Sequence, residues 1–384
     1  MAQWNRVPLI DYIELIGGGT PKTTVPEYWN GNIPWLSVKD FNNDKRYVYS
    51  TEKHISQSGF ENSPTKMLHK DDIIISARGT VGEIAMIPFD MAFNQSCYGI
   101  RASRGIDQPF LYYLLKNCIS QLKRMTHGSV FDTITRDTFA NIEVDIPDAE
   151  TQKRISSVLA DIDNKIEVND AINDNLQQQA SALFSSFYDW SNTEVRYTDL
   201  IQILGGGTPK TGENTYWNGN IAFFTPKDVG TPYTLITEKT ITEEGLSHCN
   251  SRLYPVNTVF VTARGTVGKV GMSGVPMAMN QSCYALVGKE THQLLVYFYT
   301  LKAVDRLKHK ASGAVFDAIT TRDFESEQIM KLSDDDAKAF LCIAEPMFQK
   351  VLNNCIENLR LSTLRDSLLP KLMSGEVDVS AVKL

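Results

Sequence analysis

Hydrophobic and polar residues follow two different periods along this chain, and each period occurs twice. Apolar runs of strand length appear in the same order in both halves, at residues 33–38, 72–77 and 96–102 and again at 221–226, 258–263 and 282–288. An apolar stretch with helical spacing follows each set, at residues 109–125 and 294–310. The pattern predicts two successive units, each of mixed helix and strand.

After each unit, apolar residues recur at alternate steps of four and three, which is the spacing of a coiled-coil seam. The first seam runs from Ile155 to Phe187 and the second from Phe340 to Leu372, and a helix of about 36 residues would span roughly 54 Å. Four asparagines occupy equivalent seam positions: Asn169, Asn173, Asn354 and Asn358. They would fix the register and would face one another whether the helices pack parallel or antiparallel. Pro346 is tolerable near a first turn, and Pro370 is expected to end or kink the second helix.

The amino-acid sequence itself is duplicated. GGGTPKTTVPEYWNGNI begins at Gly17 and GGGTPKTGENTYWNGNI begins at Gly205, and TEKHI, ARGTVG and NQSCY return in the second half as TEKTI, ARGTVG and NQSCY. The triple glycines stop any helix and allow positive φ. The expected division is a first unit of residues 1–150, a central helix of 151–190, a second unit of 191–334 and a C-terminal helix of 335–384.

Composition limits the class of protein. The 384 residues are 42% apolar and 22% charged, which is typical of a soluble protein with substantial cores. Neither a long apolar run nor a secretory signal is readable, so we expect a cytoplasmic protein without membrane contact. The six cysteines form no CxxC pair, which favours reduced, buried thiols. The net charge of −7 is spread along the chain, so any DNA-binding face must be local or completed by a partner.

Several kinds of chemistry are disfavoured. GGGTPK matches neither GxxxxGK[ST] nor GxGxxG, and Pro21 and Pro209 remove a backbone donor where a phosphate cradle needs one. The six histidines do not recur at equivalent positions, and no HExxH, Walker, [DN]PP[FYW] or nuclease carboxylate pattern is found. We therefore predict no metal site and no catalytic residues.

DNA binding fits the repeated cations better. Lysine and arginine recur among Thr, Ser, Asn and aromatic residues in both copies, at Lys22, Lys39, Arg78, Lys123, Lys210, Lys227, Arg264 and Lys308. Such side chains suit phosphate contact, and arginine can also read guanine. The plain alternative for each of these residues is a solvated surface cation. Trp29 and Trp217 are more often core residues than contacts.

Base-reading residues are expected where the two copies differ, because residues identical in both would hold the fold or the phosphates. The differing segments are residues 42–49 against 230–235 and residues 56–66 against 242–252. The candidate base readers in and around them are Asn42, Asn43, Lys45, Arg46, Tyr47, Tyr233, Asn250 and Arg252.

Taken together, these features resemble the specificity subunit of type I restriction-modification enzymes. GGGTPKT…YWNGNIPWLSVKD, and ARGTVG followed by NQSCY, are similar to the family's target recognition domains. IPDAETQKRI at Ile146, ALFSSFYDW at Ala182 and LRDSLLPKLMSGEVDV at Leu364 resemble the entry and exit of its central helix and its C-terminal ending. The resemblance covers essentially the whole chain; the second unit departs from it at Ile329 to Ala337, where Ile-Pro and Gln are missing.

The resemblance implies an α+β protein with two tandem recognition domains, an internal pseudo-two-fold repeat, and two long helices in an antiparallel coiled coil. Each domain would read one half of a bipartite, asymmetric target in double-stranded DNA. The helices would set the spacer and dock two methyltransferase subunits, which restriction subunits join. The chain would be non-catalytic and bind no cofactor, since S-adenosylmethionine, ATP and magnesium belong to the partners.

Two other classes of function stay open at this point. A stand-alone or modification-only DNA-binding adaptor, without a restriction subunit, would use the same domains but bind DNA tightly alone. An enzyme acting alone is disfavoured because no reactive constellation is duplicated with the fold.

Overall fold

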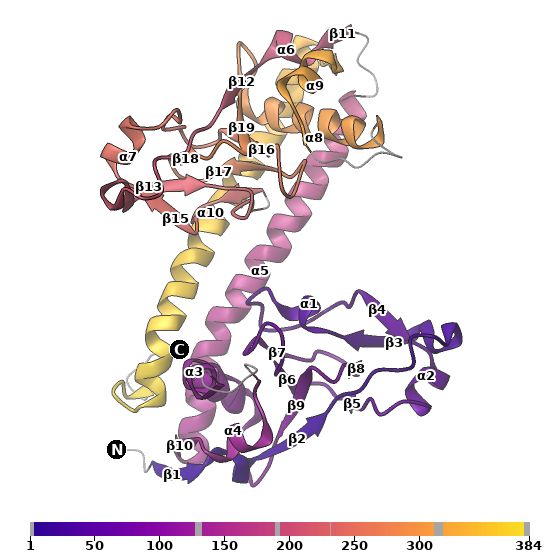
Figure 1. The fold of residues 1–384 in the computed structure, drawn as a ribbon, viewed down its shortest axis with the longest axis vertical. Coiled ribbons are helices and arrows are strands. Elements are labelled where there is room, and N and C mark those ends of the chain that lie inside the picture. The colour runs from indigo at the N-terminus through magenta and orange to yellow at the C-terminus, as the bar shows by residue number, and fades with distance from the viewer. Residues whose placement is uncertain (1–3, 127–132, 189–192, 231, 311–317, 380–384) are drawn as a thin grey trace. The chain divides into compact units, whose positions relative to one another are not determined.

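The computed structural model describes residues 4–126, 133–188, 193–230, 232–310 and 318–379. These residues form two compact units. Unit 1 contains residues 1–166 and 360–384, and unit 2 contains residues 167–359 (Figure 1). Each unit therefore combines one mixed α and β repeat with part of each long helix.

Unit 1 is built on two small sheets and one strand pair. The first sheet has the order β2 (Ile13–Gly17), β9 (Cys97–Ala102), β6 (Ile73–Ser76), β7 (Ile84–Met86). The second has the order β4 (Lys53–Ile55), β3 (Trp29–Leu36), β8 (Met91–Phe93), β5 (Met67–Leu68). β1 (Asn5–Pro8) pairs antiparallel with β10 (Glu143–Ile146). The predicted runs at residues 33–38, 72–77 and 96–102 are thus confirmed as strands β3, β6 and β9.

Helix α3 (Gln108–Thr126) joins the first sheet to the long helices of unit 1. Its Phe110 and Leu115 belong to the same buried cluster as Ile73 of β6, Leu159 of α5 and Leu372 of α10. The short elements are η1 (Leu9–Tyr12), η2 (Pro26–Tyr28), α1 (Val38–Phe41), α2 (Gln57–Glu61) and α4 (Arg136–Ala140). One core therefore holds the sheet and the helix pair together.

Unit 2 repeats this arrangement. Its first sheet has the order β12 (Ile201–Gly205), β19 (Cys283–Gly288), β16 (Val259–Thr262), β17 (Val270–Ser273), β14 (Tyr233–Thr234). Its second has the order β15 (Lys239–Ile241), β13 (Trp217–Phe224), β18 (Met277–Met279), and β11 (Thr193–Arg196) pairs with β20 (Gln328–Lys331). The helical elements are α6 (Tyr197–Leu200), η3 (Asn214–Tyr216), α7 (Glu243–Ser247), α8 (Gln293–Lys310) and α9 (Thr321–Ser326). The predicted duplication therefore holds for structure as well as for sequence.

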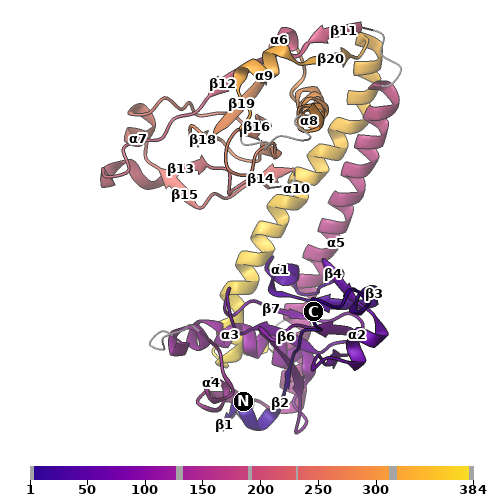
Figure 2. The same cartoon turned by 45° about the vertical axis from the view of Figure 1, so that its right-hand side comes forward.

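The long helices are α5 (Ala149–Tyr188) and α10 (Asp334–Met373). Figures 1 and 2 show them side by side within each unit. Unit 1 pairs the start of α5 with the end of α10, and unit 2 pairs the end of α5 with the start of α10. The helices are therefore antiparallel, which confirms the coiled coil that the resemblance implied.

The two prolines of the second long helix differ in their place within it. α10 begins at Asp334, so Pro346 lies about three turns inside the helix. The expectation that Pro346 lies near a first turn is wrong, because the helix starts earlier than the apolar seam. α10 ends at Met373, less than one turn beyond Pro370, as expected for a proline that terminates a helix.

Candidate nucleic-acid interface

The middle glycine of each triple packs against the loop that carries NQSCY. A Cβ on Gly18 would lie 2.0 Å from the Asn94 carbonyl oxygen, and a Cβ on Gly206 would lie 2.1 Å from that of Asn280. None of the six glycines has a positive φ. The positive φ that glycine allows is therefore not used at these positions, and the second and third glycines of each triple instead provide room for close backbone approach.

The loop after the glycines is held in the same way in both units. The Trp29 indole nitrogen donates to the Lys22 carbonyl oxygen at 3.3 Å, and the Trp217 indole nitrogen donates to that of Lys210 at 3.2 Å. Lys53 Nζ lies 5.7 Å from the Trp29 ring centroid, and Lys239 repeats this contact on Trp217. Each unit thus fixes the backbone beneath its exposed Lys22 or Lys210 side chain.

The ARGTVG loop contacts the same NQSCY segment from another side. The Arg78 backbone N–H donates to the Ser96 carbonyl oxygen at 3.2 Å, and Arg264 donates to that of Ser282 at 3.3 Å. Gly82 has φ of 84° and leaves room for the Lys123 side chain, whose Cε would lie 2.5 Å from a Cβ there. Lys308 lies over Gly268 in the same way. The end of α3 or α8 is thereby placed over the arginine-bearing loop.

We call these contacting loops the shared loop cluster. It consists of residues 17–22, 77–82 and 94–96 in unit 1 and residues 205–210, 263–268 and 280–282 in unit 2. The cluster brings together the loops that bear Lys22 and Arg78, with Lys123 of α3 packed on them, and likewise the loops that bear Lys210 and Arg264, with Lys308 of α8. Lys39 on α1 and Lys227 are also exposed, and Lys227 pairs with Glu238 at 3.4 Å. Exposed cations on backbone-anchored loops are suited to contact phosphates.

Some polar residues of the cluster were not among the candidate site residues predicted from the sequence. The Thr20 hydroxyl donates to the Gln95 side-chain oxygen, and Thr208 donates to that of Gln281. Both glutamines are exposed. The signal that could have found them, and also Lys53 and Lys239, is their identity at equivalent positions of the two copies.

The candidate base readers of unit 1 fall into two groups. Asn42, Asn43 and Lys45 have exposed side chains on the loop after α1. Arg46 is half-buried and donates to the Ala160 carbonyl oxygen at 3.4 Å and to the Asn164 side chain of α5. Arg46 therefore anchors this loop to the long helix, while its reading of bases stays a prediction.

Tyr47 and Tyr233 prove to be structurally equivalent. Tyr47 bridges Met86 and Tyr233 pairs with Met272, both in parallel orientation. The Tyr47 hydroxyl donates to Asp71 Oδ1 at 3.2 Å, and the Tyr233 hydroxyl donates to Asn257 Oδ1 at 3.0 Å. The two tyrosines therefore occupy equivalent positions in the two copies, and their reading of bases stays a prediction.

Asn250 and Arg252 of unit 2 are exposed. Gly207 of the shared loop cluster lies against Asn250, since a Cβ there would approach the Asn250 backbone nitrogen to 2.6 Å. In unit 1, Gly19 lies against Thr65 in the same manner. The ends of the variable segments 56–66 and 242–252 thus border the cluster.

The described residues contain no group of three or more His, Cys, Asp or Glu side chains that could hold a metal ion. Burial raises the pKa of the Cys97 thiol and of the Cys283 thiol to about 12. These equivalent thiols are therefore protonated near neutral pH and unsuited to act as nucleophiles. Within the described part of the chain, no helix is long and apolar enough to cross a membrane.

Duplicated α+β units with equivalent cationic loops, joined by an antiparallel helix pair, define a two-domain DNA-recognition protein. Residues 1–178 and 189–331 match the family model described as the type I restriction modification DNA specificity domain. The chain belongs to this family. Among its relatives, it is 24% identical to the type I restriction enzyme MjaIX specificity subunit of Methanocaldococcus jannaschii, over 98% of this chain and 94% of that protein.

Two further comparisons agree with this membership. The type I restriction enzyme HindI specificity subunit of Haemophilus influenzae is 25% identical over 70% of this chain and 77% of its own length. The crystal structure of a type I restriction-modification system S subunit from M. genitalium matches with a TM-score of 0.59 and 13% identity, covering 97% of this chain and 96% of that one. This structural likeness shows that the fold is shared.

Proposed function

We propose that the chain is the DNA-reading subunit of a type I restriction-modification complex, in which unit 1 and unit 2 each read one half of a bipartite, asymmetric target. The shared loop cluster, together with the helix end packed on it, would hold the phosphates through repeated cations: Lys22, Arg78 and Lys123 in unit 1 and Lys210, Arg264 and Lys308 in unit 2. The variable segments 42–49, 56–66, 230–235 and 242–252 would read the bases, above all through Asn42, Asn43, Lys45, Asn250 and Arg252.

One observation carries this proposal: the shared loop cluster has the same contacts in both units, whereas the loop beside it differs. Tyr47 follows Asp40 by seven positions in unit 1, whereas Tyr233 follows the equivalent Asp228 by five positions in unit 2. Two domains that bind the same polymer but read different bases are expected to share their phosphate-binding surface and to differ in the loop next to it.

The helices would set the distance between the two half-sites and dock two methyltransferase subunits, which restriction subunits would join. Catalysis, S-adenosylmethionine, ATP and magnesium would belong to these partners, and the complex would act on DNA in the cytoplasm. Partner chains would also supply phosphate contacts that a chain of net charge −7 lacks. A stand-alone or modification-only adaptor is not favoured by the family comparison.

The decisive experiment co-expresses the chain with a type I methyltransferase subunit from the same genome and maps methylated adenines by sequencing the host DNA. The expected result is a motif of two different half-sites separated by a spacer of fixed length. A continuous palindrome, or failure of the two proteins to co-purify, would contradict the proposal. Tight DNA binding by the chain alone would favour the adaptor.

A second experiment tests the assignment of base readers. Exchanging residues 42–66 for their counterparts in unit 2 should change one half-site and leave the other unchanged. If binding instead weakens equally on all sequences, these residues contact phosphates rather than bases.

A further inference from the structure

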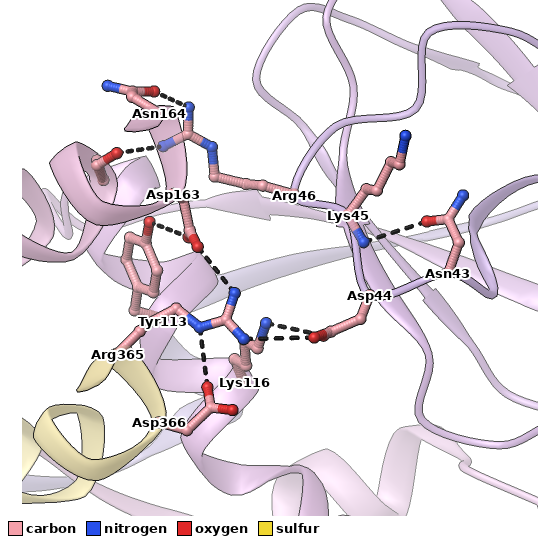
Figure 3. Close-up of polar contacts among 11 residues, drawn as sticks. Asn43, Asp44, Lys45, Arg46, Tyr113, Lys116, Asp163, Asn164, Arg365 and Asp366 are labelled. Atoms are coloured by element: carbon pink, nitrogen blue, oxygen red, sulfur yellow. Dashed lines mark hydrogen bonds and ion pairs between the residues drawn. The ribbon is translucent and has the colours of Figure 1, made fainter. Parts of the chain in front are cut away.

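A buried arginine lies where the helix pair meets the first repeat. Arg365 of α10 is 4% exposed. It donates to Asp163 Oδ1 at 2.8 Å, to Asp366 Oδ1 at 2.8 Å and to Asp44 Oδ2 at 3.3 Å (Figure 3). Burial lowers the pKa of Arg365, but these carboxylates outweigh it and leave that pKa above its ordinary value. The guanidinium therefore stays charged and keeps all three partners.

The same network includes helix α3. The Tyr113 hydroxyl donates to Asp163 Oδ2 at 2.6 Å, and Lys116 Nζ lies 3.1 Å from Asp44 Oδ1. Asp163 of α5 is buried, whereas the Asp44 side chain is 72% exposed. Arg365 therefore links two rigid helices, through Asp163, to one exposed residue of a loop.

That loop carries candidate base readers. Asp44 has φ of 55°, between the exposed residues Asn43 and Lys45, and the Asn43 side chain accepts a hydrogen bond from the Lys45 backbone N–H at 3.1 Å. Two residues on, the Arg46 carbonyl oxygen accepts from the Met86 backbone N–H at 2.7 Å. The loop is thus anchored at Arg46, by its backbone on the sheet and by its side chain on α5, and at Asp44 on α3 and α10. Asn42, Asn43 and Lys45 lie next to the Asp44 anchor, so loss of that anchor would free this exposed part of the loop.

The equivalent positions of unit 2 do not carry this ionic network. The position equivalent to Arg365 in the repeat is Ala180, and the position equivalent to Asp163 is Phe348; both are buried in an apolar cluster. The Phe348 ring packs 5.6 Å from the Phe298 ring, centroid to centroid. The ionic network is therefore a property of the first repeat alone.

We propose that Arg365 is a positioning residue for base recognition by unit 1, an inference that rests on the proposed function. It holds Asp44 against α3, α5 and α10 and so fixes the conformation in which Asn42, Asn43 and Lys45 meet the DNA. Discrimination within one half-site then depends on the last turns of the C-terminal helix, and discrimination within the other half-site does not.

The test replaces Asp44 by asparagine in the complex with the methyltransferase subunit. Asp44 is exposed, and Arg365 keeps Asp163 and Asp366 as partners, so the substitution removes the charged tether while the buried guanidinium stays paired. The Lys116 ammonium, whose side chain is 13% exposed, loses its ion pair with Asp44, so a variant at Arg365 is needed beside D44N. The probe is the host genome, which offers sites that deviate from the wild-type motif by one base in either half. The D44N variant should raise methylation roughly tenfold at sites that deviate from the motif in the half-site read by unit 1. Methylation at sites that deviate in the other half-site should not change. A tenfold effect is part of the discrimination that one base contact supplies.

Asp366→Asn is the matched control, because Asp366 also accepts from Arg365 and is exposed, yet lies on α10 rather than on the loop. It should leave both half-sites as in the wild type. Arg365→Lys keeps the charge but loses the fork that reaches Asp44 and Asp163 together, so it should relax the same half-site as D44N. Equal relaxation of both half-sites, wild-type behaviour of D44N, or identical effects of D44N and D366N would overturn the inference. Failure of the proposed function would differ, since the wild-type complex would then give no bipartite motif.

Discussion

The Asn169 side-chain amide donates to the Asn358 side-chain oxygen at 2.8 Å, and Asn354 donates to Asn173 at the same distance. Asn169 pairs with the later asparagine of α10 and Asn173 with the earlier one, which is the order required by antiparallel helices. The prediction that the seam asparagines face one another is confirmed, and their control of register remains to be tested.

Replacing Asn169 by leucine should lower the free energy of unfolding by about 1–3 kcal/mol, because Asn358 loses a buried partner. Adding Asn358→Leu should cost less than the sum of the two single changes, with a coupling of about 0.5–3 kcal/mol. Thermal unfolding of the four proteins in the cycle measures this. Asn353→Leu, an exposed neighbour on the same helix, is the control, and additive losses in the cycle would show that the pair does not act together.

Removing Arg78 and Arg264 should weaken DNA binding by the complex uniformly across sequences, because each would contact phosphate. Each substitution by alanine should reduce the slope of log affinity against log salt by about one. A salt titration of binding to target and non-target duplexes provides the measurement. Lys70→Ala removes an exposed cation that has no counterpart in the second copy, and an equal effect there would count against a specific role for the arginines.

Gly18→Ala should destabilise unit 1 by about 1–3 kcal/mol, because the new methyl group overlaps the Asn94 carbonyl oxygen. Gly17→Ala should change stability by less than about 0.5 kcal/mol, since nothing lies within 4 Å of a Cβ there. Thermal unfolding distinguishes the two neighbours. Similar losses for both would mean that the close approach does not explain the repeated glycines.

The buried thiols should resist alkylation. The pKa of Cys97 and that of Cys283 are raised to about 12 from an ordinary value of 9.0, so iodoacetamide at pH 9 should label exposed Cys342 first. Because the folded-state pKa is raised, the stabilisation from these thiols is complete below pH 9 and is lost as the pH rises from 9 towards 12. Peptide mass spectrometry and unfolding at several pH values check the two parts, and rapid labelling of Cys97 in folded protein would refute both.

Inserting one heptad between Ile166 and Glu167 and another between Arg360 and Leu361 should lengthen each helix by about 10.5 Å. If the helices act as a ruler, the spacer of the target should grow by about three base pairs while both half-sites stay the same. Mapping methylated sites gives both quantities at once. A constant spacer with altered half-sites would remove the ruler from the proposed function.

The amino-acid sequence by itself determined the duplication, the strand and helix order, the seam with its asparagines and the family. These depend on local periodicity and on identity between copies, which are readable along one dimension. Only the tertiary structure decided which way the helices run, that the second and third glycines of each triple serve close packing rather than positive φ, and that Tyr47 and Tyr233 occupy one equivalent position. The physical reason is that each of these depends on contacts between residues far apart in the chain. The same holds for Arg365. Its place in the apolar seam predicts only that it is buried, whereas its role depends on Asp163 and Asp44, which only the fold places next to it.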